Sequence, residues 1–399
     1  MPSICLYFQV HQPYRLRPFS FFDIGGSSDY EDEENNRAIL NKVADKCYLP
    51  ANALLLSLID EHGSDFRFAF SLTGTVLEQL ERYRPDVLES FRRLAATGCV
   101  EFLGETYFHS LAFLFSPREF KEQVKLHREK IKRLFGLSSL TFRYTELIYS
   151  DELAALVEGM GYRTILAEGA DRILGSRSPN FVYRPAGGTK MKLLLKNYRL
   201  SDDIAFRFSD YQWCEYPLTA DKFASWLHQL RDSSDVVNLF LDYETFGEHH
   251  WQETGIFAFL RALPQQILTS AAFRFRTPSE VVKESKPVAD LESPSPISWA
   301  DGERDLSAWL GNAMQQDASR TLYELEDQVR RKKDPALLYA WRKLQTADHF
   351  YYMSTKGGSD GEVHAYFNPY ASPYDAYINY MNILDDFSRC LAMTRRARS

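Results

Sequence analysis

The sequence predicts an α/β fold in which a parallel sheet, closed into a barrel, is followed by a C-terminal helical domain. Short apolar runs alternate with amphipathic helical patterns from Ser3 to about Ser285, as in β/α units around a parallel sheet. A proline- and serine-rich stretch over residues 286–298 ends this alternation, and helical spacing dominates after it. The alternation also permits an open, doubly wound sheet, and we prefer the barrel because of the length of the region.

Seven short apolar runs are the candidate strands, and most are followed at once by polar or aromatic residues. They span residues 4–10, 66–71, 99–103, 140–144, 164–167, 192–195 and 236–241. Helix signals lie between them. Residues 116–119 supply an N-cap serine, a first-turn proline and a capping-box glutamate, and Gly136 ends the helix that they open. Residues 277–280 repeat this start signal near the end of the region.

The C-terminal part is predicted to be a separate helical bundle. We place a catalytic barrel in residues 1–290 and a helical domain that contributes to the substrate cleft in residues 291–399. Three apolar stripes at helical spacing support this, and the first consists of Leu306, Trp309, Leu310, Ala313 and Met314. An aromatic and glycine-rich loop is expected over residues 356–373, before the last helix.

Composition restricts the partners and the compartment. The formal net charge of −7 argues against a nucleic-acid partner, because such binding requires clustered Lys and Arg. The five cysteines are widely spaced and include no C-x-x-C pair, which indicates a reducing compartment. Residues 1–10 lack the basic start of a signal peptide, and no apolar stretch is long enough to span a bilayer. We therefore expect a cytoplasmic protein without a membrane partner; composition does not indicate an oligomeric state.

Reactive side chains are expected where strands end, because parallel α/β folds place their active sites there. The candidates are His11, Glu105, His109, Glu146, Asp242 and Glu244. Cleavage of a glycosidic bond through a covalent intermediate requires one carboxylate as nucleophile and a second, protonated carboxyl as acid. Glu146 and Asp242 come from strands far apart in sequence and could supply this pair. Asp242 and Glu244 point to the same face of a strand, so spacing does not decide which is the acid.

The motifs around these residues resemble those of glycoside hydrolase family 57. H-Q-P at residues 11–13 is similar to its first motif, and GCVEFLGETYFHSL at 98–111 is similar to its second. FRYTELIYSD at 142–151 resembles the motif that carries the nucleophile, and LDYETFGEHH at 241–250 the motif that carries the acid/base. SWADGERDLSAWLGN at 298–312 is similar to the C-terminal region whose tryptophan reaches the glucan.

The resemblance implies a (β/α)7-type distorted barrel followed by a helical bundle, with retention of configuration and α-1,4-glucans or maltooligosaccharides as substrates. It implies Glu146 as nucleophile and Asp242 as acid/base, and neither a metal nor a cofactor. The wording of the motifs is closest to the α-amylase group, with 4-α-glucanotransferase or branching enzyme as alternatives. The residues expected to contact substrate are His11, Gln12, Glu105, His109, Glu244 and Trp309, with Trp299 as a second choice for the tryptophan.

Two other classes of function stay open from the sequence. A barrel of this kind could bind glucan without cleaving it. A metal-dependent deacetylase or mannosidase would instead require an aspartate and two histidines around one ion. The histidines available for that are His11, His109, His249, His250 and His364. A retaining hydrolase requires that the carboxyl groups of Glu146 and Asp242 face each other at about 5–5.5 Å.

Overall fold

The computed structural model describes residues 1–26, 29–269 and 272–393. Its barrel strands coincide with the seven predicted runs to within two residues at either end. They are β1 (Ser3–Val10), β2 (Phe68–Leu72), β3 (Val100–Phe102), β4 (Thr141–Arg143), β5 (Thr164–Glu168), β7 (Lys192–Lys196) and β8 (Val236–Asp242). Almost all of their residues are buried, as expected of parallel strands covered by helices.

The seven strands close into a distorted barrel. Parallel pairing runs from β7 through β8, β1 and β2 to β3, and β5 pairs with both β4 and β7. The ring closes between β3 and β4 through a parallel bridge of Gly104 with Phe142. A Cβ on Gly104 would lie 2.4 Å from the hydroxyl of Tyr162, so only glycine permits this approach. The pairing between β7 and β8 is short, since Lys196 and Asn238 form its one paired position. The barrel prediction is thus confirmed over the open sheet.

Three further strands were not predicted, because a charged residue, Arg184, Arg274 or Asp290, interrupts the apolar pattern in each. β6 (Val182–Pro185) runs antiparallel to β7, and β10 (Asp290–Leu291) pairs with β6. β9 (Arg274–Phe275) pairs with β1. All three lie outside the closed ring. Consequently, the stretch predicted as a linker is held to the barrel by β10 and by hydrogen bonds of Ser293 with Asp151.

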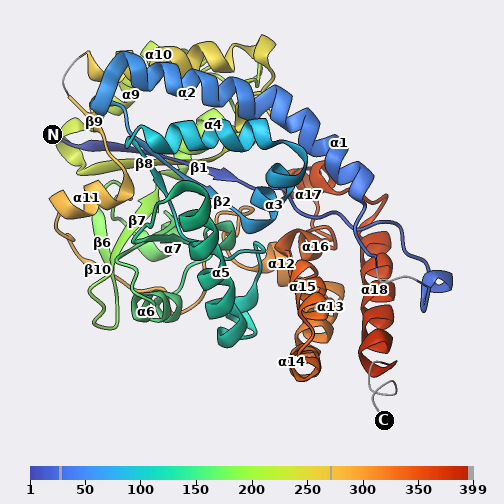
Figure 1. The fold of residues 1–399 in the computed structure, drawn as a ribbon. Helices are drawn as coiled ribbons and strands as arrows, with labels where there is room; N and C mark the ends of the chain where they lie inside the picture. Colours follow the sequence, from blue (N-terminus) through green and yellow to red (C-terminus); the bar gives the residue numbers. More distant parts are fainter. Residues whose placement is uncertain (27–28, 270–271, 394–399) are drawn as a thin grey trace.

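Helices surround the barrel (Figure 1). They are α1 (Glu33–Val43), α2 (Leu49–His62), α3 (Gly74–Tyr83), α4 (Pro85–Ala96), α5 (Pro117–Phe135), α6 (Asp151–Gly159), α7 (Asp171–Leu174), α8 (Tyr198–Ala205), α9 (Ala220–Gln229), α10 (Ile256–Leu268) and α11 (Pro278–Glu284). The predicted start signals hold. The hydroxyl of Ser116 accepts from the backbone N–H of Glu119, and a capping box opens α11 at Thr277. None of the helices in the described part of the chain combines the length and apolar character that crossing a bilayer requires.

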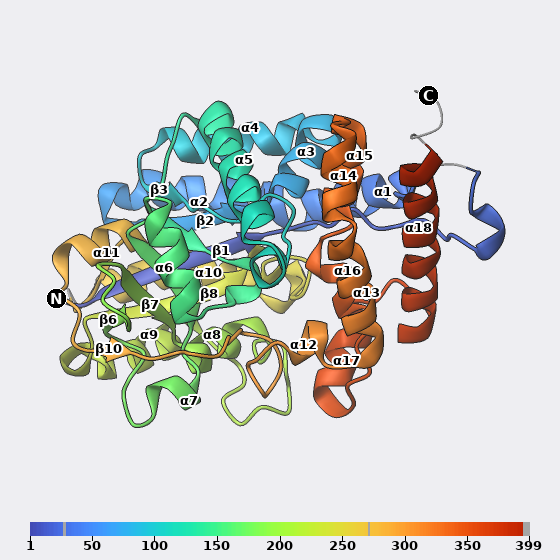
Figure 2. The same ribbon diagram turned by 90° about the horizontal axis from the view of Figure 1, so that it is seen from below.

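The C-terminal region is helical, as predicted. It comprises α12 (Ser307–Leu310), α13 (Ala313–Glu324), α14 (Glu326–Lys332), α15 (Pro335–Lys343), α16 (Ala347–Tyr351), α17 (Gly358–Phe367) and α18 (Pro373–Met393). In Figure 2, β1 runs from the N-terminus toward these helices, which therefore stand at the carboxyl ends of the strands. One apolar core joins Phe142 and Tyr144 of the barrel to Leu322 and Trp341 of the helices. A domain boundary near residue 290 remains a prediction.

The predicted loop over residues 356–373 is wrong for its first part, which forms α17. Glycine disfavours helices, and the glycines of this stretch are why the sequence indicated a loop. Tertiary contacts offset that preference. The ring of His364 stacks on Tyr351 at 3.8 Å between centroids, and its Nε2 lies 3.1 Å from both carboxylate oxygens of Asp301.

Candidate active site

Glu146 follows β4 in a tight turn with a strained backbone. Its φ of 58° and ψ of 28° lie in the left-handed region, and Leu147 and His109 also have positive φ. Non-glycine residues pay roughly 1–3 kcal/mol for such conformations, and they persist where surrounding contacts impose them. The turn directs Glu146 away from the run of the strand and toward groups from other parts of the chain.

Two donors hold the Glu146 carboxylate in its ionised form. Nε2 of His109 lies 2.6 Å from Oε1, and the indole N–H of Trp299 donates to Oε2 at 2.7 Å. Burial opposes ionisation, but His109, Arg143 and Trp299 outweigh it and lower the pKa of Glu146. A carboxylate that stays charged and fixed at both oxygens is suited to nucleophilic attack.

Asp242 ends β8, beside Gln9 of β1, and stays protonated to higher pH. Burial, followed by the charge of Glu146, raises the pKa of Asp242 to about 6, although Arg143 and Lys196 act in the opposite direction. Two neighbouring carboxyl groups with separated pKa values can act as base and acid in one reaction. The effect of the Glu146 charge on the pKa of Asp242 indicates that the two carboxyl groups lie in the same site.

Glu244 is buried behind Asp242, and the hydroxyl of Tyr48 donates a hydrogen bond to it. Burial and the charge of Asp242 raise the pKa of Glu244 to about 8. The side-chain amide of Gln12 donates to the same tyrosine hydroxyl at 3.5 Å, so both residues belong to one buried layer. Glu244 is 8% exposed, which leaves little of it for contact with substrate.

A stacked histidine pair connects the barrel to the C-terminal helices. The rings of His11 and His109 lie 4.0 Å apart at 23°. Nε2 of His11 is 2.9 Å from Asp348 of α16, and its Nδ1 is 2.9 Å from the hydroxyl of Thr73. Because a carboxylate only accepts, His11 donates through Nε2 and accepts from Thr73. Sequence reasoning missed Asp348, since nothing in its helical surroundings distinguishes it from a surface carboxylate.

The two histidines of the pair carry different charges. Burial and the neighbouring His109 lower the pKa of His11, so His11 is neutral. Burial also acts to lower the pKa of His109, but the carboxylates of Glu105 and Glu146 outweigh it and raise that pKa to about 9. His109 is therefore the cation that faces Glu146.

Glu105 and Arg143 complete the charged floor of the site. Glu105 is fully buried, 3.9 Å from Nδ1 of His109 and 3.9 Å from His127. The Arg143 guanidinium lies 5.2 Å above the Trp299 ring, and none of its nitrogens has a hydrogen-bond partner among the described residues. The buried Arg143 cation favours the ionised forms of Glu146 and Asp242. Glu105 thus acts through His109 rather than at an open surface.

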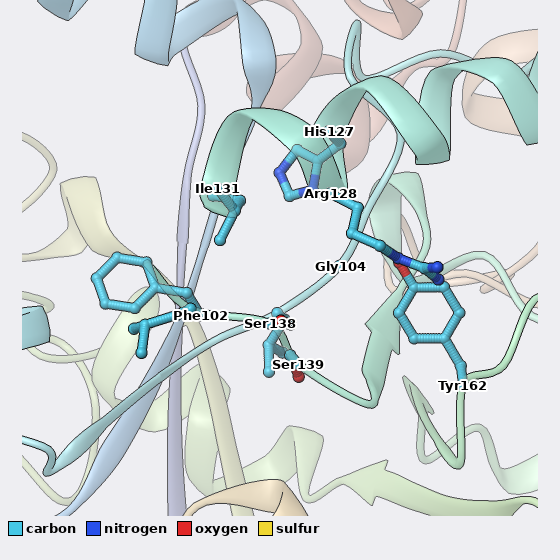
Figure 3. Close-up of a pocket in the computed structure, with 10 residues that line it drawn as sticks. Phe102, Gly104, His127, Arg128, Ile131, Ser138, Ser139 and Tyr162 are labelled. Carbon is cyan, nitrogen blue, oxygen red and sulfur yellow. The ribbon is translucent and has the colours of Figure 1, made fainter. Parts of the chain in front are cut away.

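His127 fixes the strand end that carries Glu105. It lines a small cavity together with Gly104 and Tyr162 (Figure 3). Nδ1 of His127 accepts from the backbone N–H of Glu105 at 3.3 Å, and Nε2 lies 2.8 Å from the carbonyl of Leu72. Both ring nitrogens of His127 are thus bound to backbone atoms and are not available to a ligand. We therefore regard this cavity as a packing gap.

Trp309, the tryptophan expected to contact the substrate, lies in the core of the protein. Trp309 is 1% exposed and packs in the core beside Tyr351, where a glucan chain has no access. Trp299, the second choice, donates to Glu146 directly. Both sit in the segment singled out from the sequence, and helical spacing made Trp309 the more visible of the two. The apolar spacing that made Trp309 visible in the sequence arises because Trp309 packs in the core.

Replacing Trp299 by Phe is expected to lower kcat about 10- to 100-fold, because a hydrogen bond to a charged group contributes roughly 1.5–3 kcal/mol. Loss of this donor also raises the pKa of Glu146, so the acidic limb of the kcat/KM profile moves to higher pH. The matched variant Trp309→Phe should keep the limb in place and lower the melting temperature. A limb that moves in Trp309→Phe alone would contradict this assignment of the two tryptophans.

Of the five histidines considered for a metal, His249, His250 and His364 have other partners, whereas His11 and His109 lie together with Asp348. His250 is bound to the hydroxyl of Ser209 and the carbonyl of Ala205, and His364 to Asp301. His249 packs edge-on against Phe367. Within the described ranges, His11, His109 and Asp348 are the histidine-containing group whose donor atoms lie within 4.8 Å of one another. In that group the two Nε2 atoms each already face a carboxylate.

Comparisons with known proteins agree with the resemblance of the motifs. The family model described as glycosyl hydrolase family 57 matches residues 5–293. A protein of Methanocaldococcus jannaschii named "Putative alpha-amylase" is 45% identical over 394 residues, covering 95% of this chain and 83% of that protein.

Solved structures extend the similarity of fold to the C-terminal helices. A 4-alpha-glucanotransferase from Thermococcus litoralis has a TM-score of 0.68 at 15% identity, covering 88% of this chain and 56% of that one. A branching enzyme from Thermococcus kodakaraensis has a TM-score of 0.69 at 13% identity, with coverages of 92% and 87%. At these identities the likeness concerns the fold. The family model spans most of the chain and the archaeal relative nearly all of it, and the chain belongs to glycoside hydrolase family 57.

Proposed function

We propose that this protein is a retaining, α-amylase-like hydrolase of α-1,4-glucans and maltooligosaccharides, with Glu146 as nucleophile and Asp242 as acid/base. The observation that carries the proposal is the Glu146 carboxylate, which His109 and Trp299 hold at 2.6 and 2.7 Å; its pKa is lowered, whereas that of the neighbouring Asp242 is raised to about 6. The "alpha-amylase" name of the archaeal relative supports the substrate class. A cytoplasmic location remains part of the proposal, supported by the odd number of cysteines.

The reaction proceeds by two displacements at C1 of the glucose residue. Protonated Asp242 gives its proton to the glycosidic oxygen while Glu146 forms a bond to C1, and the reducing-end fragment leaves. Bond formation removes the negative charge of Glu146, which had raised the pKa of Asp242. Asp242 therefore becomes a stronger acid and remains ionised as the base. It then takes a proton from water, whose oxygen displaces Glu146 and restores the original configuration.

The pH dependence of kcat/KM should follow the two carboxyl groups. Asp242 must be protonated, so kcat/KM should fall about tenfold per pH unit above about 6. Glu146 must be ionised, and its lowered pKa keeps it so through the weakly acidic range. A profile of maltoheptaose cleavage between pH 3 and 9 checks this, with Glu244→Gln expected to retain the basic limb. A basic limb that disappears in Glu244→Gln would transfer the acid role to Glu244.

The products of maltoheptaose decide among the possible reactions. Purified protein is incubated with this sugar, with and without a chelator, and the products are separated by chromatography. Shorter sugars that form equally in both samples support the proposal. Longer sugars would indicate a 4-α-glucanotransferase or branching enzyme, and activity lost on chelation would indicate a metal-dependent enzyme. Unchanged substrate together with binding would indicate a non-catalytic glucan-binding protein.

A further inference from the structure

An open cleft lies near the active site, at the carboxyl ends of β5 and β7. It is a cleft of about 300 Å³, at the lower limit of ordinary ligand-binding clefts. Its walls come from the start of α7, the start of α8 and the loop that precedes α12. The side chains that matter here are Asp171, Arg172, Tyr198, Glu303 and Arg304. Figure 2 shows the chain between β10 and α12 passing along this edge of the barrel, near α7 and α8.

A continuous series of contacts joins this cleft to Glu146. Trp299 donates to Glu146, and the ammonium of Lys196 lies 5.2 Å above the Trp299 ring. On its other side Lys196 is 3.7 Å from the buried carboxyl of Glu168. Glu168 in turn pairs with Arg304 at 3.0 Å, and Arg304 forms a wall of the cleft. Three side chains, those of Trp299, Lys196 and Glu168, therefore connect the nucleophile to the wall of the cleft.

The shape of the cleft is fixed by the loop over residues 298–305. Asp301 and Arg304 in this loop both have positive φ, so the surrounding contacts hold the loop in a strained form. Arg172 donates to the carbonyls of Pro296 and Arg304, and the Arg304 guanidinium lies 4.0 Å above the ring of Tyr198. A preformed wall of this kind binds a ligand without a large cost in ordering.

The chemistry of the walls favours an uncharged ligand with many hydroxyl groups. Two cations, Arg172 and Arg304, stand against two anions, Asp171 and Glu303, and Arg304 is already paired with Glu168. Glu303 is likewise paired with Lys356 at 2.7 Å. The charges of Arg172 and Asp171 that remain cancel each other, so an anion such as phosphate would find no excess positive charge in the cleft. Hydroxyl groups can instead donate to the carboxylates and to the oxygen of Tyr198, whose own proton is donated to Asp171 at 3.0 Å, and can accept from the guanidinium of Arg172.

We propose that this Tyr198–Arg304 cleft is a remote subsite, which holds a glucose residue of the glucan chain beyond those around the reacting bond. The inference rests on the proposed function, because it assigns the ligand as part of the same substrate. It makes affinity depend on chain length: a maltooligosaccharide long enough to reach the cleft gains contacts that a short one lacks.

Binding without turnover tests the subsite. Maltotriose, maltoheptaose and inorganic phosphate are titrated calorimetrically into Glu146→Gln protein, alone and combined with Tyr198→Ala, Asp171→Ala or Tyr211→Ala. Asp171→Ala leaves the stack of Arg304 on Tyr198 in place, and so covers the case that Tyr198→Ala fails to fold. Tyr211 is an exposed aromatic residue outside the cleft walls and is the matched control.

The measured quantity is the ratio of the maltoheptaose to the maltotriose affinity. We expect Tyr198→Ala and Asp171→Ala each to reduce this ratio about tenfold, equivalent to the loss of a few hydrogen bonds, and Tyr211→Ala to leave it unchanged. An equal ratio in all proteins would overturn the subsite while leaving the proposed function intact. Phosphate binding that Tyr198→Ala removes would overturn the sugar assignment. Absence of any sugar binding would overturn both.

Discussion

Glu146→Gln is expected to reduce kcat for maltoheptaose at least about 10⁴-fold while the sugar still binds. The amide cannot attack C1, and it keeps the volume of the side chain in the turn after β4. Calorimetric titration should therefore give an affinity for maltoheptaose similar to that of the unchanged protein. Glu152→Gln, an exposed residue on the first turn of α6, is the matched control and should keep full activity.

Rescue of a Glu146 variant by azide tests whether Glu146 is the nucleophile, because the anomeric configuration of the product depends on that role. In Glu146→Ala the space left by the carboxylate admits azide, which attacks C1 from the face that Glu146 occupied. The product from an activated α-glucoside should then be the β-glucosyl azide. An α-glucosyl azide from this variant would identify Glu146 as the acid/base instead, and unreduced activity of Glu146→Gln would remove it from the mechanism.

Asp242→Asn is expected to lower kcat for maltoheptaose about 10²- to 10⁴-fold, the usual contribution of a positioned general acid. A glucoside whose leaving group departs without protonation should be much less affected in the first step. For that substrate the second step becomes limiting, and azide, which needs no base, should accelerate it and give the α-glucosyl azide. The basic limb near pH 6 should disappear as well, because the group that titrates there is gone.

Glu244→Gln is the comparison for this experiment, because the sequence left both carboxyl groups as candidate acids. Its hydrogen bond from Tyr48 is retained by the amide oxygen, so the buried layer behind Asp242 should persist. We expect a modest loss of activity with either kind of substrate and no rescue by azide. Rescue of Glu244→Gln, together with an unaffected Asp242→Asn, would exchange the two assignments.

The local sequence predicted the barrel strands well, because burial on both faces produces continuous apolar runs that are visible in one dimension. It also located α5 and α11 from their capping residues, which act over a few positions only. It failed for β6, β9 and β10, in which Arg184, Arg274 and Asp290 interrupt the apolar pattern. It failed likewise for α17, where contacts of His364 outweigh the local preference of glycine.

The sequence by itself indicated the family, the position of the seven barrel strands along the chain, and that His11, Glu146 and Asp242 lie at strand ends. Tertiary structure alone decided that Trp299 rather than Trp309 meets Glu146, that Asp348 reaches His11 from α16, and that Glu244 is buried behind Asp242. The reason is physical: propensity and capping act between near neighbours in the chain. Charge, burial and hydrogen bonding at a site depend on distances between residues that only the closed barrel brings together.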